Sequence, residues 1–318
     1  MPLTEKSLIA GIRSRAHGAR AVALGIGDDC AVLRVPSGHE ILVTTDFSLE
    51  GVHFRTEWHP PEIIGHRCLA RGLSDIASMG GQPLAAFLSL ALPPGTPKSW
   101  IDRFLKGLLK LADNFHVSLA GGDTAESRKG ILADIAVVGS VAKNKAIRRS
   151  GAKAGDRIFV TGELGGSAAT LNLLFSGRPL QPKEFPQHFH PVPRIEIGRL
   201  LREHRMASAM IDISDGLSTD LAHICEESGV GAEIIAEAIP LSSIGRPLRP
   251  VDLKFALHGG DDYELLFTVP RAKKIPRRIA GVPLTQIGRI TRGKEMLLVD
   301  ERGIRRKLKP RGWQHFRR

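Results

Sequence analysis

The chain has 318 residues, among them 45 Lys and Arg, 33 Asp and Glu, three Cys and one Tyr. This length predicts about two domains, each large enough to bury its own core. Apolar residues make up 42% of the chain and charged residues 25%, values that exclude general disorder and fibrous architectures. The formal net charge of +12 is the unusual value, and it suggests nucleic acid or an anionic membrane as a partner.

Most of the positive charge lies at one end of the chain. Residues 271–318 hold 16 Lys and Arg against 3 acidic residues, a net charge of +13. Residues 1–270 hold 29 basic and 30 acidic residues and are close to neutral. The simplest interpretation is a solvated basic surface. We therefore expect no nucleic-acid partner, and a nucleic-acid-binding protein that uses the basic C-terminal region stays open as an alternative.

The cysteines and the apolar runs indicate where the protein works. Cys30, Cys68 and Cys225 form no C-x-x-C pair, so they suggest neither a disulfide framework nor a zinc site. The longest apolar run, residues 84–92, is about half as long as a bilayer span requires. The N-terminal residues show no apolar signal segment. We expect a cytoplasmic protein with no membrane partner.

Helical and strand-like patterns alternate along the chain, which predicts a mixed α/β protein with two α/β domains. Helices are expected at residues 4–15, 61–79 and 97–114. Strands are expected at residues 31–35, 41–45, 84–92, 131–142, 157–161, 208–213, 232–236, 263–269 and 284–290. The polar, basic stretch 143–156 is the best candidate boundary. It predicts an N-terminal domain over residues 1–145 and a C-terminal domain over residues 146–318.

Acidic residues recur where apolar runs end, usually beside Gly, Ser or Thr. These acids are Asp28, Asp29, Asp46, Asp75, Asp123, Asp212, Asp215, Asp261 and Asp262. Each alone is typical of a turn or a helix N-cap. Together, strand-end carboxylates in an α/β sheet tend to meet in the crevice where ligands bind, and a close pair repels by about 4 kcal/mol unless cations intervene. With the hydroxyls of Thr44, Thr45 and Ser214 beside them, they suit Mg²⁺.

Familiar nucleotide-binding motifs are absent from the sequence. Gly293 and Lys294 form the one Gly-Lys pair and are followed by Glu295, so there is no Walker A loop. A triphosphate held through carboxylate-bound Mg²⁺ needs no such lysine. Two other elements could contact anions: the glycine-rich residues 162–168, as backbone N–H donors at a helix N-terminus, and Arg149. A plain turn and a solvated arginine remain the alternatives.

Several segments, in order along nearly the whole chain, resemble the thiamine-monophosphate kinases. They are residues 25–31 (GIGDDCA), 44–46 (TTD), 50–54 (EGVHF), 73–80 (LSDIASMG), 121–124 (GGDT), 149–152 (RSGA), 212–217 (DISDGL) and 259–265 (GGDDYEL). The resemblance implies ATP-dependent phosphorylation of thiamine monophosphate to thiamine diphosphate, the last step of thiamine diphosphate biosynthesis. It also implies direct in-line transfer assisted by several Mg²⁺ ions. Another ATP-dependent enzyme of the same superfamily, similar to aminoimidazole ribonucleotide synthetase, is the nearest alternative.

The resemblance further implies the roles of individual residues and of the two domains. The matching metal ligands are Asp29, Thr44, Thr45, Asp46, Asp75, Asp123, Asp212 and Asp215. The matching nucleotide contacts are Gly122, Asp123, Arg149 and Ser214, the matching substrate contacts are His53, Asp261 and Trp313, and Asp46 and Arg149 are the expected catalytic residues. The N-terminal domain would bind ATP and Mg²⁺ and form a homodimer through its sheet. The C-terminal domain would hold a mixed sheet flanked by helices.

Two positions depart from the family pattern. Asp261 stands where the family has Glu, so the acid that faces thiamine is one methylene shorter. Phe104 stands at the position of an aromatic residue that stacks on the nucleotide, yet its helical spacing also fits a core residue.

Overall fold

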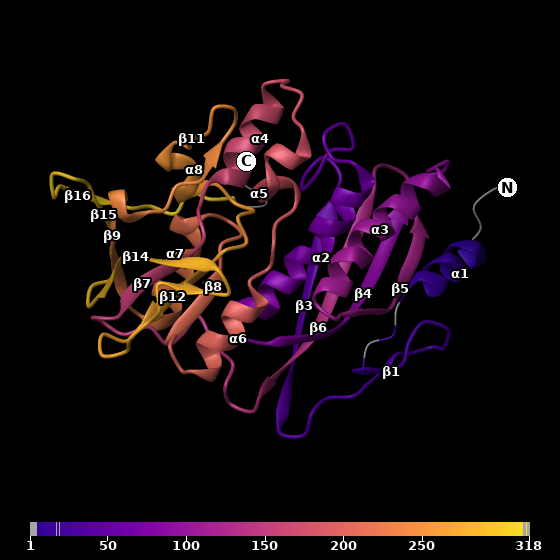
Figure 1. Cartoon of the computed structure of the whole chain (residues 1–318), viewed down its shortest axis with the longest axis horizontal. Helices are drawn as coiled ribbons and strands as arrows, with labels where there is room; N and C mark the ends of the chain where they lie inside the picture. The colour runs from indigo at the N-terminus through magenta and orange to yellow at the C-terminus, as the bar shows by residue number, and fades with distance from the viewer. Residues whose placement is uncertain (1–4, 17, 19, 314–315, 317–318) are drawn as a thin grey trace. The chain divides into compact units, whose positions relative to one another are not determined.

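The computed structural model describes residues 5–16, 18, 20–313 and 316. The chain divides into two compact units, one of residues 1–76 with 81–144 and the other of residues 77–80 with 145–318 (Figure 1). Each unit is built around a β-sheet with helices packed against it. The predicted mixed α/β fold is confirmed.

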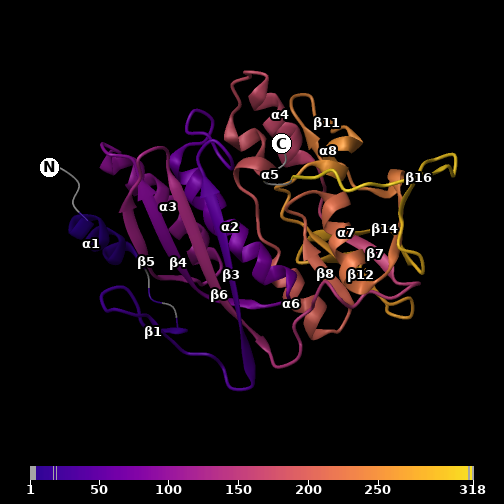
Figure 2. The same ribbon diagram turned by 180° about the vertical axis from the view of Figure 1, so that it is seen from behind.

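The first unit contains a four-stranded sheet. Its elements are α1 (Glu5–Arg15), β1 (Val22–Leu24), β2 (Val32–Leu33), β3 (His39–Leu49), α2 (Pro61–Ser78, whose last turn is grouped with the second unit), β4 (Gln82–Leu92), α3 (Lys98–Asn114), β5 (Ser118–Glu126) and β6 (Leu132–Ala142). The strand order is β3-β6-β4-β5, in which β4 and β5 are parallel and the other pairs are antiparallel. Helices α2 and α3 cover one face of this sheet (Figures 1 and 2).

The sequence pattern of α3 explains how the first unit packs. Its core-facing residues recur at helical spacing and are buried: Ile101, Phe104, Leu105, Leu108, Leu111 and Ala112. Glycines let α2 and α3 approach closely, because a Cβ on Gly107 would lie 1.8 Å from the backbone oxygen of Glu62. A Cβ on Gly65 would lie 2.0 Å from the backbone oxygen of Phe104. Larger residues at these two positions would push the helices apart.

The second unit contains a larger mixed sheet. Its helices are α4 (Gly166–Phe175), η1 (Pro182–Glu184), α5 (Pro186–Phe189), α6 (Ile195–Glu203), α7 (Leu217–Ser228), η2 (Ala236–Ala238) and α8 (Leu253–His258). Its strands are β7 (Arg157–Thr161), β8 (Ala209–Asp212), β9 (Gly231–Ile235), β10 (Ser243–Ile244), β11 (Arg249–Pro250), β12 (Leu265–Val269), β13 (Arg278–Ile279), β14 (Val282–Thr291), β15 (Met296–Val299) and β16 (Arg305–Lys307).

The order of the main sheet in the second unit is β16-β15-β9-β14-β7-β12-β8. Strands β15 and β9 are parallel, and the remaining neighbours on this path are antiparallel. Apolar residues of α7 pack on this sheet in one buried cluster that includes Leu221, Ile224 and Leu266. Because β8 lies at the edge of the sheet and leads directly into α7, the turn between them starts from a rigid core.

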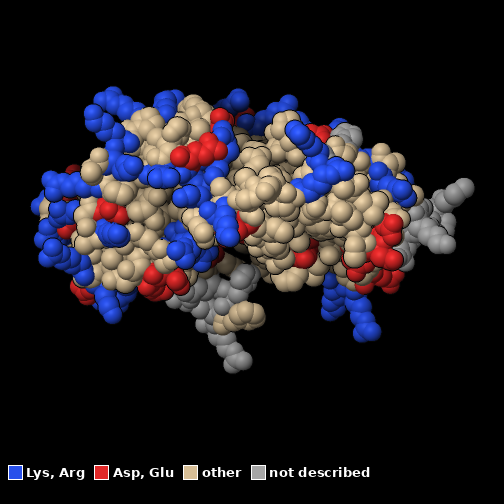
Figure 3. All heavy atoms as spheres, turned by 90° about the horizontal axis from the view of Figure 1, so that it is seen from below, with Lys and Arg blue, Asp and Glu red and all other residues tan. Residues whose placement is uncertain are grey.

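The basic C-terminal region forms part of the surface of the second unit. Lys and Arg side chains gather on this unit in the view of Figure 3. Several of them are paired within the unit: Arg289 and Arg305 both contact Glu233, and Lys307 contacts Glu295. Acidic neighbours therefore offset part of the local positive charge. In the described part of the chain, the helices are too short or too polar to span a bilayer.

Candidate active site

One group of predicted site residues lies where β3 packs against α2. Thr44 and Asp46 are two residues apart on β3, so their side chains leave the same face of the strand, and both are half-buried. The Thr44 hydroxyl donates a hydrogen bond to Oδ2 of Asp75 on α2. Thr45 lies between them and is exposed on the opposite face. The side chains of Thr44, Asp46 and Asp75 are therefore together, and the side chain of Thr45 is apart from them.

His53 follows β3 in a tight turn that fixes its ring. The backbone N–H of Leu49 donates to Nδ1 of His53 over 3.0 Å. Glu50 braces the turn, because its carboxylate accepts the Thr56 hydroxyl and the backbone N–H of Ile131, each over 2.8 Å. Since Nδ1 accepts a hydrogen bond, Nε2 of the neutral ring carries the proton. Nε2 is therefore the hydrogen-bond donor of the His53 ring.

A second group of predicted residues lines a cavity of about 740 Å³ in the first unit. Asp29, Gly122 and Asp123 contribute to its wall, and Ile9 and Ile12 of α1 contribute apolar surface. Gly122 has a φ of +145°, and a Cβ there would lie 1.8 Å from the backbone oxygen of the paired β4 strand. Glycine is therefore required at position 122 for β5 to lie against β4 beside the cavity.

The two groups belong to opposite edges of the sheet. Asp46 pairs with Ile135, Ile135 with Leu88, and Leu88 with Gly122, so these residues form one row across four strands. Three strand spacings amount to roughly 14 Å. Within one sheet, the backbones of Asp46 and Gly122 are therefore separated by the width of three strand spacings.

The turn between β8 and α7 carries three more predicted residues. Asp212 ends β8 and is 3% exposed, and Ser214 and Asp215 are half-buried in the turn. Asp220, in the first turn of α7, accepts the backbone N–H groups of Asp215 and Gly216 over 3.2 and 3.0 Å. Burial raises the pKa of Asp220 well above its ordinary value, and the charges of Asp212 and Asp215 raise it further. Carboxylates placed so close together favour a cation between them.

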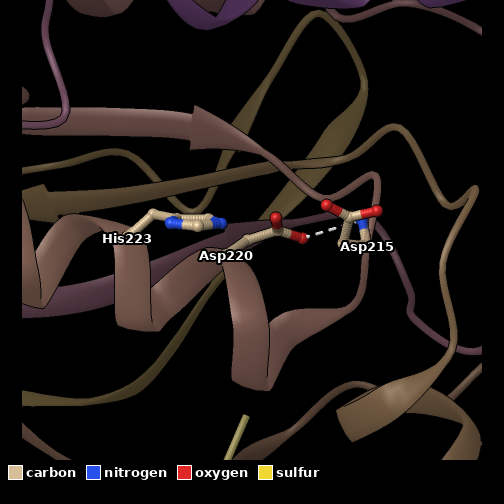
Figure 4. A group of neighbouring side chains, drawn as sticks. All are labelled: Asp215, Asp220 and His223. Carbon is tan, nitrogen blue, oxygen red and sulfur yellow. Dashed lines mark hydrogen bonds between the residues drawn. The ribbon is translucent and has the colours of Figure 1, made fainter. Parts of the chain in front are cut away.

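Among the described residues, one group of three acidic or histidine side chains has ligand atoms within 4.8 Å of one another: Asp215, Asp220 and His223. In Figure 4, Asp220 and His223 project from the same side of α7, and the Asp220 carboxylate points toward Asp215. The carboxylates suit Mg²⁺, and the imidazole suits softer metals. Asp220 and His223 were not expected from sequence. Their spacing of three residues on a helix that directly follows Asp215 is the signal that could have found them.

Asp261 lies in a loop that is hydrogen-bonded to the same turn. The backbone N–H groups of Asp261 and Tyr263 donate to the backbone oxygens of Ser214 and Ile213, each over 2.9 Å. Asp261 and Tyr263 have φ values of +64° and +52°, which non-glycine residues seldom adopt. The Tyr263 hydroxyl donates to Oδ1 of Asp261 over 2.6 Å. The one tyrosine of the chain therefore holds the shorter acid in a fixed position.

Trp313 reaches this turn from the C-terminal end of the described chain. Its backbone N–H donates to the backbone oxygen of Asp215 over 3.2 Å, and the residue is 54% exposed. The turn therefore gathers predicted metal, nucleotide and substrate residues within the second unit.

Arg149 lies in the loop before β7. Arg149 is exposed, and its backbone oxygen accepts a hydrogen bond from the Ser228 hydroxyl over 3.0 Å. The same hydroxyl oxygen accepts the backbone N–H groups of Gly151 and Ala152, both over 3.1 Å. The backbone around Arg149 is thus fixed to the end of α7.

The glycine-rich segment before α4 is occupied by an internal acid. The buried carboxylate of Asp262 accepts the backbone N–H groups of Gly165 and Ser167 over 2.7 and 3.4 Å. Burial raises the pKa of Asp262 to about 8. The prediction that these N–H groups point outward to an anion is wrong for Gly165 and Ser167, because Asp262 already accepts them.

Known proteins resemble the chain over both units. Two family models match the chain: the N-terminal domain of AIR synthase related proteins at residues 27–141, and their C-terminal domain at residues 153–300. Thiamine-monophosphate kinase of Salmonella typhimurium is 38% identical to it over 99% of this chain and 99% of its own length. The chain belongs to the thiamine-monophosphate kinase family. The resemblance drawn from its motifs is confirmed.

Solved structures of thiamine-monophosphate kinases share the fold of this chain. The crystal structure of the protein from Stenotrophomonas maltophilia has a TM-score of 0.81 and 36% identity, and the match covers 94% of this chain and 97% of the other. The structure of AaThiL complexed with AMPPCP and TMP has a TM-score of 0.78 and 33% identity, and the match covers 99% of both chains.

The structure does not support a nucleotide contact for Phe104. Phe104 is 0% exposed and stacks on Trp100 with ring centroids 5.5 Å apart. A side chain with no exposed surface cannot stack on a ligand without moving, so Phe104 is part of the core.

Proposed function

We propose that this protein transfers the terminal phosphoryl group of ATP to thiamine monophosphate, which yields thiamine diphosphate and ADP. The observation that carries the proposal is the full-length identity of 38% to a thiamine-monophosphate kinase. The matching fold of AaThiL, solved with AMPPCP and TMP, supports both substrates. Relatives that match over the full chain favour this activity over that of aminoimidazole ribonucleotide synthetase. In the family, the reaction completes thiamine diphosphate biosynthesis.

Mg²⁺ is the proposed metal cofactor, and the donor set of the chain fits it. Hard oxygen donors dominate among the proposed ligands. Burial raises the pKa of Asp220, and the charges of Asp212 and Asp215 raise it further, so a cation bound beside these carboxylates would offset part of the cost. The proposed side-chain ligands are Asp29, Thr44, Asp46, Asp75, Asp123, Asp212 and Asp215. Thr45 would contribute its backbone oxygen, because its side chain leaves the opposite face of β3. When bound, Mg²⁺ neutralises phosphate charge and orients the triphosphate.

The attacking group in this reaction is a phosphate oxygen of thiamine monophosphate. It is already ionised at neutral pH, so the chain needs no general base, and no protein nucleophile is proposed. The residues instead position two polyanions in line and screen their charge. Arg149 would pair with a phosphate, because its exposed guanidinium is carried on a fixed backbone. Asp46 would act catalytically through its cation.

Nucleotide and substrate contacts follow from the same geometry. Gly122 and Asp123 line the cavity of the first unit, which we propose as part of the nucleotide site, with Ser214 as a further contact. His53 would donate from Nε2 to the substrate phosphate. Asp261 and Trp313 would contact the thiamine moiety, the first as an acid and the second as an aromatic surface.

The two domains are proposed to have different roles. Residues 1–145 would bind ATP and Mg²⁺ and form a homodimer, and residues 146–318 would form the second α/β domain. The side chains on the open face of edge strand β3 support a dimer: Ile41, Val43 and Phe47 are 56, 66 and 57% exposed. Three large, exposed apolar side chains on one face of an edge strand are unusual on a solvated surface. A second copy of this chain is the proposed occupant of that face.

A cytoplasmic location is proposed on the cysteine chemistry. The three cysteines Cys30, Cys68 and Cys225 are free thiols. Free thiols persist in the reducing cytoplasm, whereas secreted proteins usually form disulfides.

A coupled assay of ADP release tests the proposed activity. The purified protein is given ATP and Mg²⁺ with thiamine monophosphate, and parallel reactions contain thiamine or no acceptor. We expect ADP release with thiamine monophosphate that stops when EDTA removes the metal. Equal ADP release with thiamine, or no release with thiamine monophosphate, would refute the proposed function.

A further inference from the structure

Residues 311–313, here called the C-terminal strap, lie against the turn that leads into α7. Three consecutive backbone N–H groups of the strap are accepted by this turn and by the first residues of α7. Arg311 donates to the Ser218 hydroxyl over 3.3 Å, and Gly312 donates to the Thr219 hydroxyl over 3.0 Å. Trp313 donates to the backbone oxygen of Asp215 over 3.2 Å. The strap is therefore bound along its length and not at one point.

Shape as well as hydrogen bonding fits the strap to the turn. A Cβ on Gly312 would lie 2.0 Å from the backbone oxygen of Asp215 and 2.6 Å from Oγ1 of Thr219. No side chain fits there unless the strap moves away. Thr219 is 4% exposed, so its hydroxyl accepts the Gly312 N–H inside the protein, where water cannot replace it. Just before the strap, Leu308 is buried in the core of the second unit.

The turn beneath the strap joins three of the proposed site elements. It includes Asp215, a proposed metal ligand, and the Ser218 hydroxyl lies 2.8 Å from Nδ1 of His258, directly before the loop of Asp261. The contacts of the strap therefore fix the backbone of Trp313 relative to Asp215 and Asp261. A shift of about 1 Å in a substrate-positioning group can lower a reaction rate about a hundredfold.

We propose that Thr219 and Gly312 are positioning residues that hold the C-terminal strap on the turn and so place the ring of Trp313 against thiamine monophosphate. Neither residue touches the substrate in this proposal. The proposal rests on the proposed function, in which Trp313 contacts the thiamine moiety. It predicts that loosening the strap weakens binding of thiamine monophosphate more than binding of ATP.

Thr219→Val is the variant that tests this proposal. Valine keeps the shape of threonine but cannot accept the Gly312 N–H. We expect the KM for thiamine monophosphate to rise about 5- to 10-fold, as the loss of a buried acceptor implies, with little change in the KM for ATP. Thr219→Ser restores the hydroxyl and should restore the KM. Thr285→Val, on β14 of the same unit, is the matched control and should leave both KM values unchanged.

A second measurement follows the strap directly. Trypsin can cleave after the exposed Arg311, and mass spectrometry detects the loss of residues 312–318. Cleavage should be faster in Thr219→Val and in Gly312→Ala than in the wild type or in Thr285→Val. Thiamine monophosphate should slow cleavage in the wild type, because the bound substrate contacts Trp313. Equal cleavage rates in all four proteins would overturn the proposal.

Kinetic measurements distinguish a failure of this proposal from a failure of the proposed function. A wild-type protein without thiamine-monophosphate-dependent ADP release would refute the proposed function itself. A normal wild-type enzyme whose Thr219→Val variant keeps its KM for thiamine monophosphate would refute only the role of the strap. Equal losses for both substrates, with a lowered Tm that Thr219→Ser does not rescue, would show a general structural role and would also refute it.

Discussion

Asp220 has two roles in the structure, and two substitutions separate them. Its Oδ2 accepts the backbone N–H groups of Asp215 and Gly216, and its charge lies beside Asp212 and Asp215. Asparagine keeps the shape and an acceptor oxygen but removes the charge. Alanine removes the acceptor as well. Comparing Asp220→Asn with Asp220→Ala therefore compares the charge with the hydrogen bonds.

The expected change in stability follows from these contacts. Asp220→Ala leaves two backbone N–H groups without their acceptor, and each costs about 1–3 kcal/mol if it stays buried. A total loss of about 2–6 kcal/mol corresponds to a fall in Tm of about 4–24 °C for a domain of this size. Asp220→Asn keeps the acceptor and removes a charge that burial and two neighbours disfavour. In EDTA, its Tm should equal or exceed that of the wild type.

Calorimetry in EDTA and activity against Mg²⁺ concentration measure the two roles. Asp220→Asn should need more Mg²⁺ for half-maximal activity, because one negative charge near the proposed cation is gone. Glu227→Gln, an exposed change of the same kind on α7, is the matched control and should alter neither Tm nor the Mg²⁺ requirement. If Asp220→Asn lowers Tm as much as Asp220→Ala does, the charge itself stabilises the turn and the reasoning is wrong.

Three further predictions concern the first unit and the thiols. Asp46→Asn should abolish turnover at unchanged Tm, and normal Mg²⁺-dependent activity in that variant would contradict its proposed role. At pH 8 a thiol reagent should label Cys30 quickly, and ATP with Mg²⁺ should slow this labelling, because Cys30 is exposed and lines the cavity. Cys68 and Cys225 should react only after unfolding, since burial raises each pKa to about 12 and leaves the neutral thiol at pH 8. Val43→Glu should convert the proposed dimer to a monomer in light scattering, and an unchanged mass would count against the β3 face.

Periodicity predicted those elements whose burial follows their sequence pattern. The helices expected at residues 61–79 and 97–114 correspond to α2 and α3, and the strand expected at 157–161 is β7. Strand β5, which carries Gly122 and Asp123, was not predicted. Its sequence contains two glycines and several polar residues, which disfavour strands. It forms because it pairs with β4 along its length, and such tertiary contacts are not visible in local pattern.

The argument that carboxylates gather at strand ends holds for Asp212, which is the last residue of β8. It is wrong for the other acids that were compared: Asp46 lies within β3, Asp123 within β5, and Asp75 within α2. The pattern of acids beside Gly, Ser or Thr still singled them out, and the family motifs gave them their expected role as metal ligands. Strand geometry alone places the side chains of Thr44 and Thr45 on opposite faces, but sequence could not show which of the two faces α2 covers.

Asp220 illustrates why part of the site lies beyond sequence reasoning. An acid in the first turn of a helix is ordinarily a favourable neighbour of the helix N-terminus, and sequence alone suggests no more. In the fold, Asp220 is buried, and the charges of Asp212 and Asp215 lie near it. Without a bound cation, the ionised form of Asp220 is therefore electrostatically unfavourable. Backbone contacts from the Asp261 loop and from Trp313 keep that turn in place. A cation bound there would lower the electrostatic cost and stabilise the folded unit, which links metal binding to local stability.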